Sequence, residues 1–223
     1  MPMNIAMDGP VGAGKSSIAD RVAKRLNILH LDTGAMYRAV ALYMLRAGVD
    51  LDDEQAIAAK LDGAQVAVRY EDGAQRTLLC GEDVSERIRT PEVSAASSAV
   101  SRWPTVRSRM VKLQRELATT ADMLIDGRDI GPRVLTDAPV KIFLTASAEE
   151  RARRRWLQQK EKGVSEPFEQ VLAELNARDA QDMNRTTDPL RQAEDAVLVD
   201  STGMTPEQVV DRIVSIVEER YGR

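Results

Sequence analysis

Cysteine and histidine are almost missing from this chain, which has one residue of each among its 223. A single cysteine excludes an internal disulfide and a zinc site built from cysteines. We expect Cys80 to be a small apolar residue within a strand. We expect the lone His30, in the strand-like stretch 28–31, to serve packing rather than catalysis.

The chain also lacks long apolar runs and an excess of positive charge. No run approaches the roughly 20 apolar residues of a membrane-spanning helix. The formal net charge of −4 indicates no basic surface for nucleic acid. The first apolar stretch begins almost at residue 1, which leaves no room for a signal peptide before it. These absences predict a soluble, cytoplasmic protein of one domain, 1–223, with neither nucleic acid nor membrane as partner.

A glycine-rich loop followed by lysine and serine stands near the start of the chain. It fits the phosphate-binding pattern G-x-x-x-x-G-K-[ST] with Gly9, Pro10, Val11, Gly12, Ala13, Gly14, Lys15 and Ser16. Glycines let successive N–H groups point at phosphate oxygens, while Lys15 reaches the β and γ phosphates and Ser16 ligates Mg²⁺. A plain glycine turn is the alternative. The apolar strand before the loop and the helical spacing after it favour a phosphate site at a helix N-terminus, and hence nucleoside triphosphate binding.

Five short apolar runs alternate with helical patterns and predict an α/β fold. The runs are 3–7, 28–32, 123–126, 140–146 and 196–200, typical of parallel strands buried on both faces. The alternation predicts a doubly wound, five-stranded parallel sheet, with the ligand at the carboxyl ends of its strands. The last helix is expected to begin at Thr205 with a capping box that Gln208 completes.

The long gap between the second and third of these strands breaks the alternation. Residues 63–84 contain two alternating stretches around Asp72-Gly73, a pattern typical of a β-hairpin. An insertion with a small antiparallel element of this kind is expected to carry a second substrate site or a lid. A second candidate lid is 151–165, which is rich in arginine and lysine.

Charged residues follow two of the predicted strands. Asp32 and Arg38 follow the second strand, and Arg128 and Asp129 follow the third. Asp32 would lie where a carboxylate can orient Mg²⁺-bound water. The two arginines would project over the ligand crevice and suit a second anion, because a guanidinium grips phosphate bidentately. Arginines in surface helix caps are an alternative that explains either one alone better than both together.

One face of a predicted helix changes from apolar to ionic along its length. Positions 171, 175, 178, 182 and 185 form one stripe, which begins as valine and leucine and ends as Arg178, Asp182 and Arg185. A ladder of salt bridges on a solvated face is the alternative. We favour a helix that leaves the core and enters a polar site.

These motifs, in this order and over essentially the whole chain, resemble the bacterial cytidylate kinases, a family of P-loop nucleoside monophosphate kinases. The resemblance is carried by 9–16, 31–38, 88–94, 126–131, 137–144 and 178–185. It implies transfer of the ATP γ-phosphoryl group to CMP or dCMP with Mg²⁺, in pyrimidine nucleotide metabolism, by a monomer. It also implies a monophosphate-binding lobe at about 35–110 and a short lid at about 151–165.

The resemblance further implies roles for single residues. ATP would be bound by residues 9–17, the last of them Ser17. The acceptor phosphate would lie on Arg38, Arg128 and Arg185, which with Lys15 are the expected catalytic residues. Arg178 and Asp182 would meet the ribose, and Ser98, Arg107 and Asp129 the cytosine. Thr33 and Tyr37 complete the substrate-binding set, and Ser16 and, through water, Asp32 are the expected metal ligands.

The hydrogen-bonding pattern of cytosine supports the assignment of Asp129 to base recognition. Cytosine carries an amine donor beside two acceptors, so one carboxylate and one or two donors fit it. Asp129 is therefore our candidate for distinguishing CMP from UMP. Three positions depart from the family pattern: Val11 and Thr33 stand where serine is common, and Pro132, where threonine is frequent, removes a backbone donor.

Two alternatives stay open. The arginines at 151–155 form either a solvated helix face or a lid, in which Arg151, Arg154 and Arg155 close over the transferring group; we favour the lid. The acceptor in a P-loop kinase of this kind is alternatively UMP, AMP or shikimate. A nucleotide-dependent switch is disfavoured because the chain contains no Asn-Lys-x-Asp motif.

Overall fold

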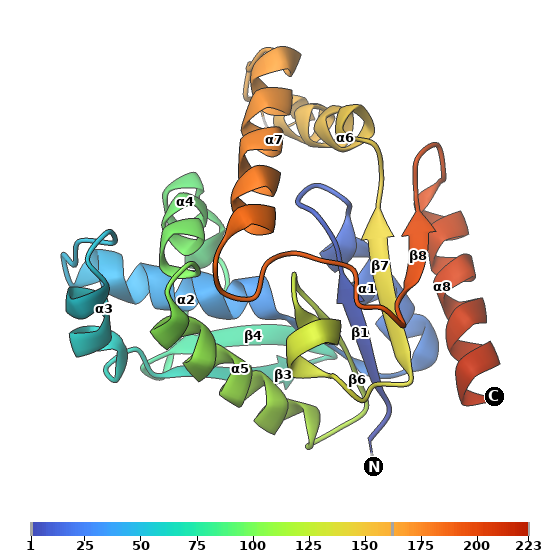
Figure 1. Cartoon of the computed structure of the whole chain (residues 1–223), viewed down its shortest axis with the longest axis horizontal. Coiled ribbons are helices and arrows are strands. Elements are labelled where there is room, and N and C mark those ends of the chain that lie inside the picture. Colours follow the sequence, from blue (N-terminus) through green and yellow to red (C-terminus); the bar gives the residue numbers. More distant parts are fainter. Residues whose placement is uncertain (1, 162, 223) are drawn as a thin grey trace.

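A sheet of five parallel strands forms the centre of the computed structural model, which describes residues 2–161 and 163–222 (Figure 1). In spatial order the strands are β2 (Leu29–Asp32), β6 (Met123–Asp126), β1 (Asn4–Asp8), β7 (Val140–Thr145) and β8 (Val197–Asp200). Each strand coincides with one of the predicted apolar runs to within a residue at either end. The predicted architecture is confirmed.

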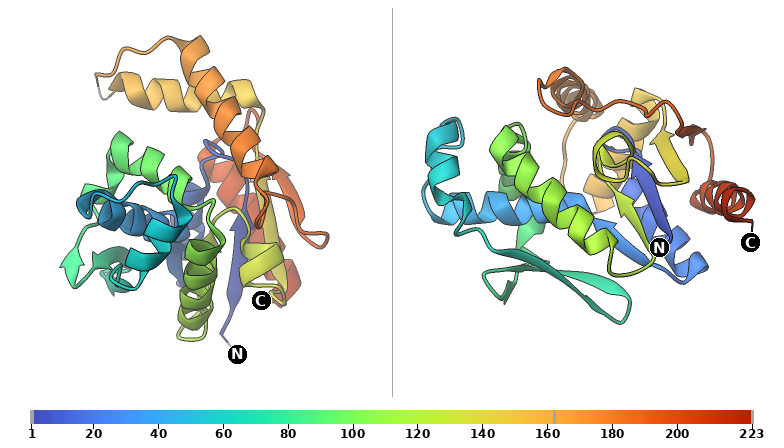
Figure 2. Two further views of the ribbon diagram at one scale, coloured as in Figure 1. Left: turned by 60° about the vertical axis from the view of Figure 1, so that its left-hand side comes forward. Right: turned by 60° about the horizontal axis from the view of Figure 1, so that its bottom comes forward.

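Helices cover both faces of this sheet, as a doubly wound fold requires (Figures 1 and 2). α1 (Lys15–Leu26) and α8 (Pro206–Tyr221) lie on one face, and α2 (Thr33–Arg46) and α5 (Pro104–Ala118) on the other. Alternate residues of β1 serve the two sides: Ile5 and Met7 pack in the cluster of α1 and α8, and Ala6 in the other. The predicted capping box at the start of α8 is present. Within the described residues no helix has the length and apolar character needed to cross a membrane.

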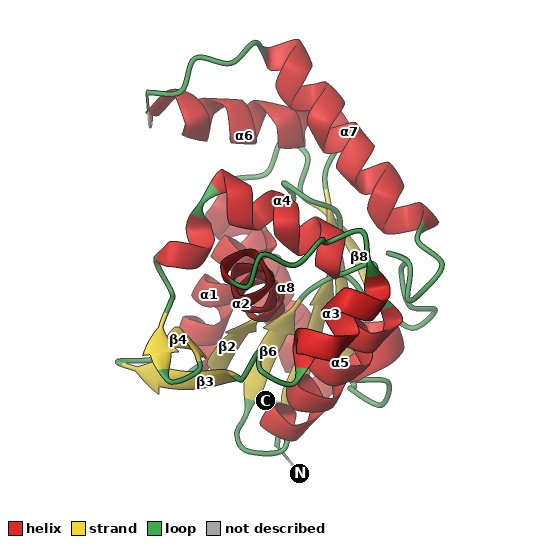
Figure 3. Cartoon of the chain, turned by 90° about the vertical axis from the view of Figure 1, so that its left-hand side faces the viewer, coloured by secondary structure: helices red, strands yellow, loops and turns green. Residues whose placement is uncertain are grey.

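The strand register brings three carboxyl ends to one level. Met7 of β1 and Asp32 of β2 both pair with Asp126 of β6. The loop after β1 and these two carboxylates therefore open at the same edge of the sheet. α6 (Ala148–Glu161) and α7 (Phe168–Asn184) stand above that edge as a helical pair (Figure 3). The predicted lid, 151–165, runs from α6 into the connection to α7, and its residue 162 lies outside the described residues.

Between β2 and β6 the chain adds a helical layer and a small antiparallel sheet. The added elements, besides α2 and α5, are α3 (Glu54–Leu61), β3 (Val66–Glu71), β4 (Ala74–Leu79), β5 (Glu82–Asp83), η1 (Arg87–Arg89) and α4 (Pro91–Val100). The predicted hairpin is confirmed: Asp72 and Gly73 have φ of 51° and 76°, as a two-residue hairpin turn requires. β5 is a third strand that the sequence pattern did not predict.

The hairpin covers the open edge of β2. The Gln75 side chain accepts a hydrogen bond from the Asp32 N–H (2.7 Å) and donates one to the Asp32 carbonyl (3.2 Å). The Tyr70 hydroxyl donates to the His30 carbonyl at 3.1 Å. An edge strand exposes unpaired backbone groups, and here side chains of the inserted hairpin bind them.

The prediction for Cys80 was wrong. Cys80 is exposed and follows the last residue of β4 rather than lying within a strand. It has a φ of 51°, and Gly81 after it has a φ of 83°. The tight turn from β4 into β5 needs these two left-handed residues, so the strand ends at Leu79.

Candidate active site

The glycine-rich loop connects β1 to α1 at the carboxyl edge of the sheet. Gly9, Gly12 and Gly14 have φ of 151°, 77° and 84°, a range that side chains disfavour. A Cβ on Gly9 would lie 2.0 Å from the Leu144 carbonyl oxygen, so only glycine fits there. α1 begins at Lys15 with no side-chain cap on its first N–H groups. The loop therefore presents backbone donors and a helix N-terminus to an anion.

Lys15 folds back over this loop. Its ammonium group donates to the Pro10 carbonyl at 2.8 Å, and the residue is 6% exposed. Burial, and then the charge of Arg128, lower the pKa of Lys15 to about 7. A phosphate beside this lysine would favour its charged form.

Ser16 and His30 share one carboxylate, that of Asp126 at the end of β6. Ser16 Oγ donates to Asp126 Oδ2 at 2.9 Å, and His30 Nε2 lies 2.8 Å from Asp126 Oδ1. Burial alone would raise the pKa of Asp126, but the hydrogen bond and charge of His30 lower it. Burial likewise opposes the charge on His30, yet Asp126 raises its pKa. His30 thus contributes more than packing: it holds a carboxylate that lies against the loop serine.

The sequence analysis gave Asp126 no role, although it is the last residue of the predicted strand 123–126. In the structure this strand, β6, pairs with β1. Asp32, which was expected near the metal, caps α2 by accepting from the Ala35 N–H at 3.0 Å. Its other carboxylate oxygen binds Arg38 at 2.8 Å. Asp32, Asp126 and Ser16 all line one cleft.

This cleft has a volume of about 480 Å³ and brings together most of the predicted site. From the loop it is lined by Val11, Gly12, Gly14, Lys15, Ser16 and Ser17. Gly9, Pro10 and Ala13 are buried. Every predicted substrate-binding residue lines it as well: Thr33, Tyr37, Arg38, Ser98, Arg107, Arg128, Asp129, Arg178, Asp182 and Arg185.

Cations crowd one part of the cleft. Arg128 donates to Asp182 at 2.9 Å, and Arg185 donates to the Asp188 carbonyl at 2.7 Å. Among the described residues, Arg38 Nε and Arg185 Nη2 are buried donors without a hydrogen-bond partner. Burial, followed by the charge of Arg128, lowers the pKa of Arg178. Such a cluster of donors fits a phosphate group.

The predicted base-reading residues form a second, more buried cluster. Arg107 is 2% exposed and binds Asp129 through Nη2 at 2.5 Å, with its guanidinium over the Tyr37 ring. Ser98 lies on α4. Asp188, another residue that sequence reasoning missed, binds Arg107 Nε at 3.0 Å from a left-handed backbone with φ of 46°. Its position in a loop after α7 gave no local signal of this contact.

A third missed residue, Asp8, holds the loop that carries this cluster. Its two carboxylate oxygens accept from the N–H groups of Ile130 and Gly131, each at 2.7 Å. These residues begin η2 (Ile130–Val134), directly after Asp129. Burial outweighs both hydrogen bonds and raises the pKa of Asp8 to about 7. The last residue of β1 thus fixes the segment that follows β6.

The structure places the three predicted lid arginines differently from one another. Arg155 lines the cleft. Arg154 also lines it, but its guanidinium binds the hydroxyl (3.0 Å) and the carbonyl (2.7 Å) of Ser201. Arg151 is 7% exposed and binds Asp179 at 2.6 Å, behind the loop. The expectation that all three close over the transferring group does not hold for Arg151, because its guanidinium binds the Val11 carbonyl of the loop and Asp179 of α7.

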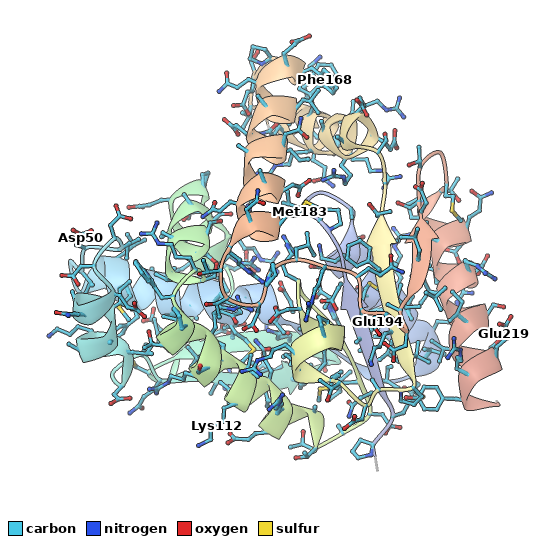
Figure 4. All side chains as sticks on the ribbon, viewed as in Figure 1. Asp50, Lys112, Phe168, Met183, Glu194 and Glu219 are labelled. Atoms are coloured by element: carbon cyan, nitrogen blue, oxygen red, sulfur yellow. The ribbon has the colours of Figure 1, made fainter. Side chains whose placement is uncertain are left out.

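α7 links the outer part of the molecule to the cleft. Figure 4 shows Phe168 at the outer end of this helix and Met183 at its inner end, above the sheet. All four residues of its stripe line the cleft: Val171 and Leu175 are buried apolar residues of the outer half, and Arg178 and Asp182 are charged residues of the inner half. The predicted change from an apolar to an ionic face is present, and its ionic half lies among the charged residues of the cleft, where Asp182 accepts from Arg128 at 2.9 Å.

Comparisons with known proteins cover nearly the whole chain. A family model described as cytidylate kinase matches residues 5–219. A protein named cytidylate kinase from Caldicellulosiruptor saccharolyticus is 48% identical over 220 residues, 99% of this chain and 97% of the relative. One of the same name from Mycobacterium avium is 49% identical over 217 residues, 97% of this chain and 95% of the relative. A solved structure of an uncharacterized protein from Eubacterium ventriosum shares the fold, with a TM-score of 0.55 at 13% identity over 99% of this chain and 100% of that one.

Proposed function

The chain belongs to the cytidylate kinase family, and from this premise we propose how its cleft phosphorylates CMP and dCMP with ATP. The observation that carries the proposal is the meeting of two anion sites in one cleft. The glycine loop with Lys15 is one, and the cluster of Arg38, Arg128 and Arg185 is the other. A kinase for a nucleoside monophosphate needs both, because donor and acceptor each bring phosphate groups.

In the proposed reaction an oxygen of the acceptor phosphate attacks the γ-phosphorus of ATP. A new P–O bond forms, the bond from the γ-phosphorus to the β–γ bridging oxygen breaks, and ADP leaves with that electron pair. A phosphate monoester is mostly a dianion at neutral pH, so the attack needs no general base. The loop N–H groups and Lys15 hold the donor, while the three arginines bring the acceptor into line and offset its charge.

We propose that the Arg107–Asp129 pair and Ser98 read the base. Asp129 offers the carboxylate that the N4 amine of cytosine needs, and the neighbouring donors suit O2 and N3. Uracil presents an acceptor in place of the amine, and a buried carboxylate facing it would stay unpaired. Arg178 and Asp182, on the adjoining stripe of α7, are proposed to contact the ribose.

The few oxygen ligands near the loop suit Mg²⁺ better than they suit a metal ion coordinated by protein side chains alone. The described residues contain no group of three or more His, Cys, Asp or Glu side chains arranged to hold a metal ion. Mg²⁺ does not need such a group, since it keeps several waters and binds one or two protein oxygens plus substrate phosphates. Ser16 and, through water, Asp32 would hold it, with Asp126 as the partner that orients Ser16. When bound, Mg²⁺ neutralises charge on the β and γ phosphates.

We further propose that the enzyme acts as a monomer in the cytoplasm. Its cleft is assembled from residues of one chain, so a second copy is not needed to complete it. Its substrates, ATP and cytidine monophosphates, are cytoplasmic metabolites. The net charge of −4 supports small-molecule substrates without a nucleic-acid partner.

The test is ADP production from Mg·ATP with CMP, dCMP, UMP, AMP and shikimate offered separately. We expect turnover with CMP and dCMP well above the rest, and loss of turnover in a folded Lys15→Ala variant. Faster turnover with UMP, AMP or shikimate would overturn the cytosine assignment and leave the kinase fold. ATP binding without acceptor-dependent turnover would overturn the proposed reaction.

A further inference from the structure

The buried Arg151–Asp179 ion pair binds both backbone groups of one loop residue, Val11. The Val11 N–H donates to Asp179 Oδ1 at 3.2 Å, and the Val11 carbonyl accepts from Arg151 Nη1 at 2.9 Å. The two side chains are joined at 2.6 Å. Arg151 comes from α6 and Asp179 from α7, so both helices of the pair reach the phosphate loop.

The side chain of Val11 reinforces this connection. It packs against a small apolar cluster of α6 and α7, formed by Ala152, Val171 and Leu175. A Cβ on the next residue, Gly12, would lie 3.0 Å from Leu175 and 3.3 Å from the Cβ of Arg151. The two helices therefore rest directly on the loop, and valine supplies an apolar contact at a position where serine would not.

Neither member of the ion pair is placed to bind substrate. Arg151 Nε donates to the Ala146 carbonyl at 3.0 Å, just after β7, so the guanidinium spans three segments. The Val11 N–H already donates to Asp179, so it is not free to donate to a phosphate. The N–H groups left for the anion are those nearer to α1.

From these contacts we infer that Arg151 and Asp179 are positioning residues for the donor nucleotide. They set the backbone of Val11, and through it the direction of the loop N–H groups, and they couple that conformation to the position of α6 and α7. The inference rests on the proposed function only in taking the loop as the donor site. It assigns Arg151 a role different from that of Arg155, which faces the cleft.

The experiment compares Asp179→Asn, Arg151→Lys and the double variant Arg151→Met/Asp179→Leu with the wild type. The measured quantities are the calorimetric Kd for ADP, the KM for CMP and the melting temperature. Asp195→Asn is the matched control. Asp195 also pairs with a buried cation, Lys141, at 2.7 Å, but neither residue contacts Val11. Calorimetry of ADP does not depend on acceptor chemistry.

We expect Asp179→Asn to raise the Kd for ADP by about tenfold through the displaced loop, with the KM for CMP changed by less than about twofold. Arg151→Lys should retain part of the affinity, since it keeps the charge without the paired donors. The double variant should fold and still bind ADP weakly, because it leaves no unpaired buried charge.

Unchanged ADP affinity in Asp179→Asn and in the double variant would overturn the inference and leave the proposed function intact. So would equal weakening of ADP and CMP, or a loss of ADP affinity no greater than in Asp195→Asn at the same melting temperature. If the wild type binds ADP tightly, and Asp179→Asn weakly, but neither phosphorylates CMP, the inference holds and the proposed acceptor is wrong. Absence of ADP binding in the wild type would overturn both.

Discussion

The Lys15 ammonium group lies where little water can solvate it, and this makes its charge depend on what binds beside it. Burial lowers its pKa to about 7, below the ordinary value of 10.5. A bound diphosphate would stabilise the charged form and raise the pKa again. Above about pH 7 the free protein therefore carries fewer protons at Lys15 than the complex, and binding must take up a proton.

The first prediction is proton uptake on ADP binding at about pH 8. Isothermal titration in buffers of different ionisation enthalpy should show close to one proton taken up per ADP, and the affinity should fall as the pH rises above about 7. Lys15→Met should abolish the uptake. Asp8→Asn, which removes the other nearby group with a pKa of about 7, should retain it. Uptake that persists in Lys15→Met would assign the proton to another group.

Asp129 has two tasks in the structure, since it holds Arg107 as well as facing the cleft. Replacement by alanine would leave Arg107 without this partner and disturb the whole base site, so it would not isolate base discrimination. Asparagine keeps an acceptor for Arg107 and adds an amide donor. That donor suits the O4 acceptor of uracil.

The second prediction is that Asp129→Asn lowers the ratio of kcat/KM for CMP to that for UMP by about tenfold or more. Steady-state kinetics with both acceptors measure it. Asp182→Asn is the control, because a ribose contact is shared by both nucleotides and its loss should leave the ratio unchanged. A ratio that stays at the wild-type value in Asp129→Asn would remove this residue from base selection.

At the scale of elements, the inserted hairpin supports the strand that carries Asp32. Gln75 binds both backbone groups of Asp32, and Asp32 in turn binds Arg38. The third prediction is that Gln75→Ala destabilises the protein by about 1–2 kcal/mol and raises the KM for CMP more than that for ATP. Urea unfolding and steady-state kinetics test it. Gln65→Ala, at an exposed site in the same insertion, should stay within about 0.5 kcal/mol of wild type. Equal KM changes for both substrates would contradict the proposed path through Arg38.

Elements defined by neighbouring residues could be predicted from the sequence, whereas contacts between distant segments could not. The five strands, the Asp-Gly turn and the loop before α1 depend on local pattern, and the structure has them. The hydrogen bonds between Gln75 and Asp32 join residues 43 apart in sequence, and the bond between Arg107 and Asp188 joins residues 81 apart. Helical spacing put Arg151 on the same face as Arg154 and Arg155, but packing against Asp179 decided what that face meets. Gly81 signals a turn in the sequence, but nothing local shows that the turn includes Cys80 before it, which has a φ of 51°.

At the scale of the whole molecule, residues of the sheet's carboxyl edge, the insertion after β2 and the α6–α7 pair line the cleft. Figure 1 shows how these three parts are arranged. α7 contributes to both proposed substrate sites. Asp179 accepts from the Val11 N–H of the phosphate loop, while the preceding residue, Arg178, and Asp182, about one turn further on, line the cleft. α7 thus connects the two proposed substrate sites. Binding of either substrate should therefore change the stability of α7.

The last prediction concerns hydrogen exchange of backbone amides in the presence of one substrate at a time. ADP alone should slow exchange in the phosphate loop, α6 and α7, while CMP alone should slow it in α4, η2 and the inner turn of α7, because each ligand orders the segments that surround it. Mass spectrometry of peptic fragments resolves these regions, and α8, on the far face of the sheet, serves as the internal control. In Asp179→Asn the effect of ADP on α6 and α7 should shrink while that of CMP on α4 remains, since the link between loop and helices is broken and the acceptor side is not. Protection of α6 and α7 that is the same in wild type and variant would mean that these helices respond to the nucleotide directly, through residues such as Arg155, and not through the loop.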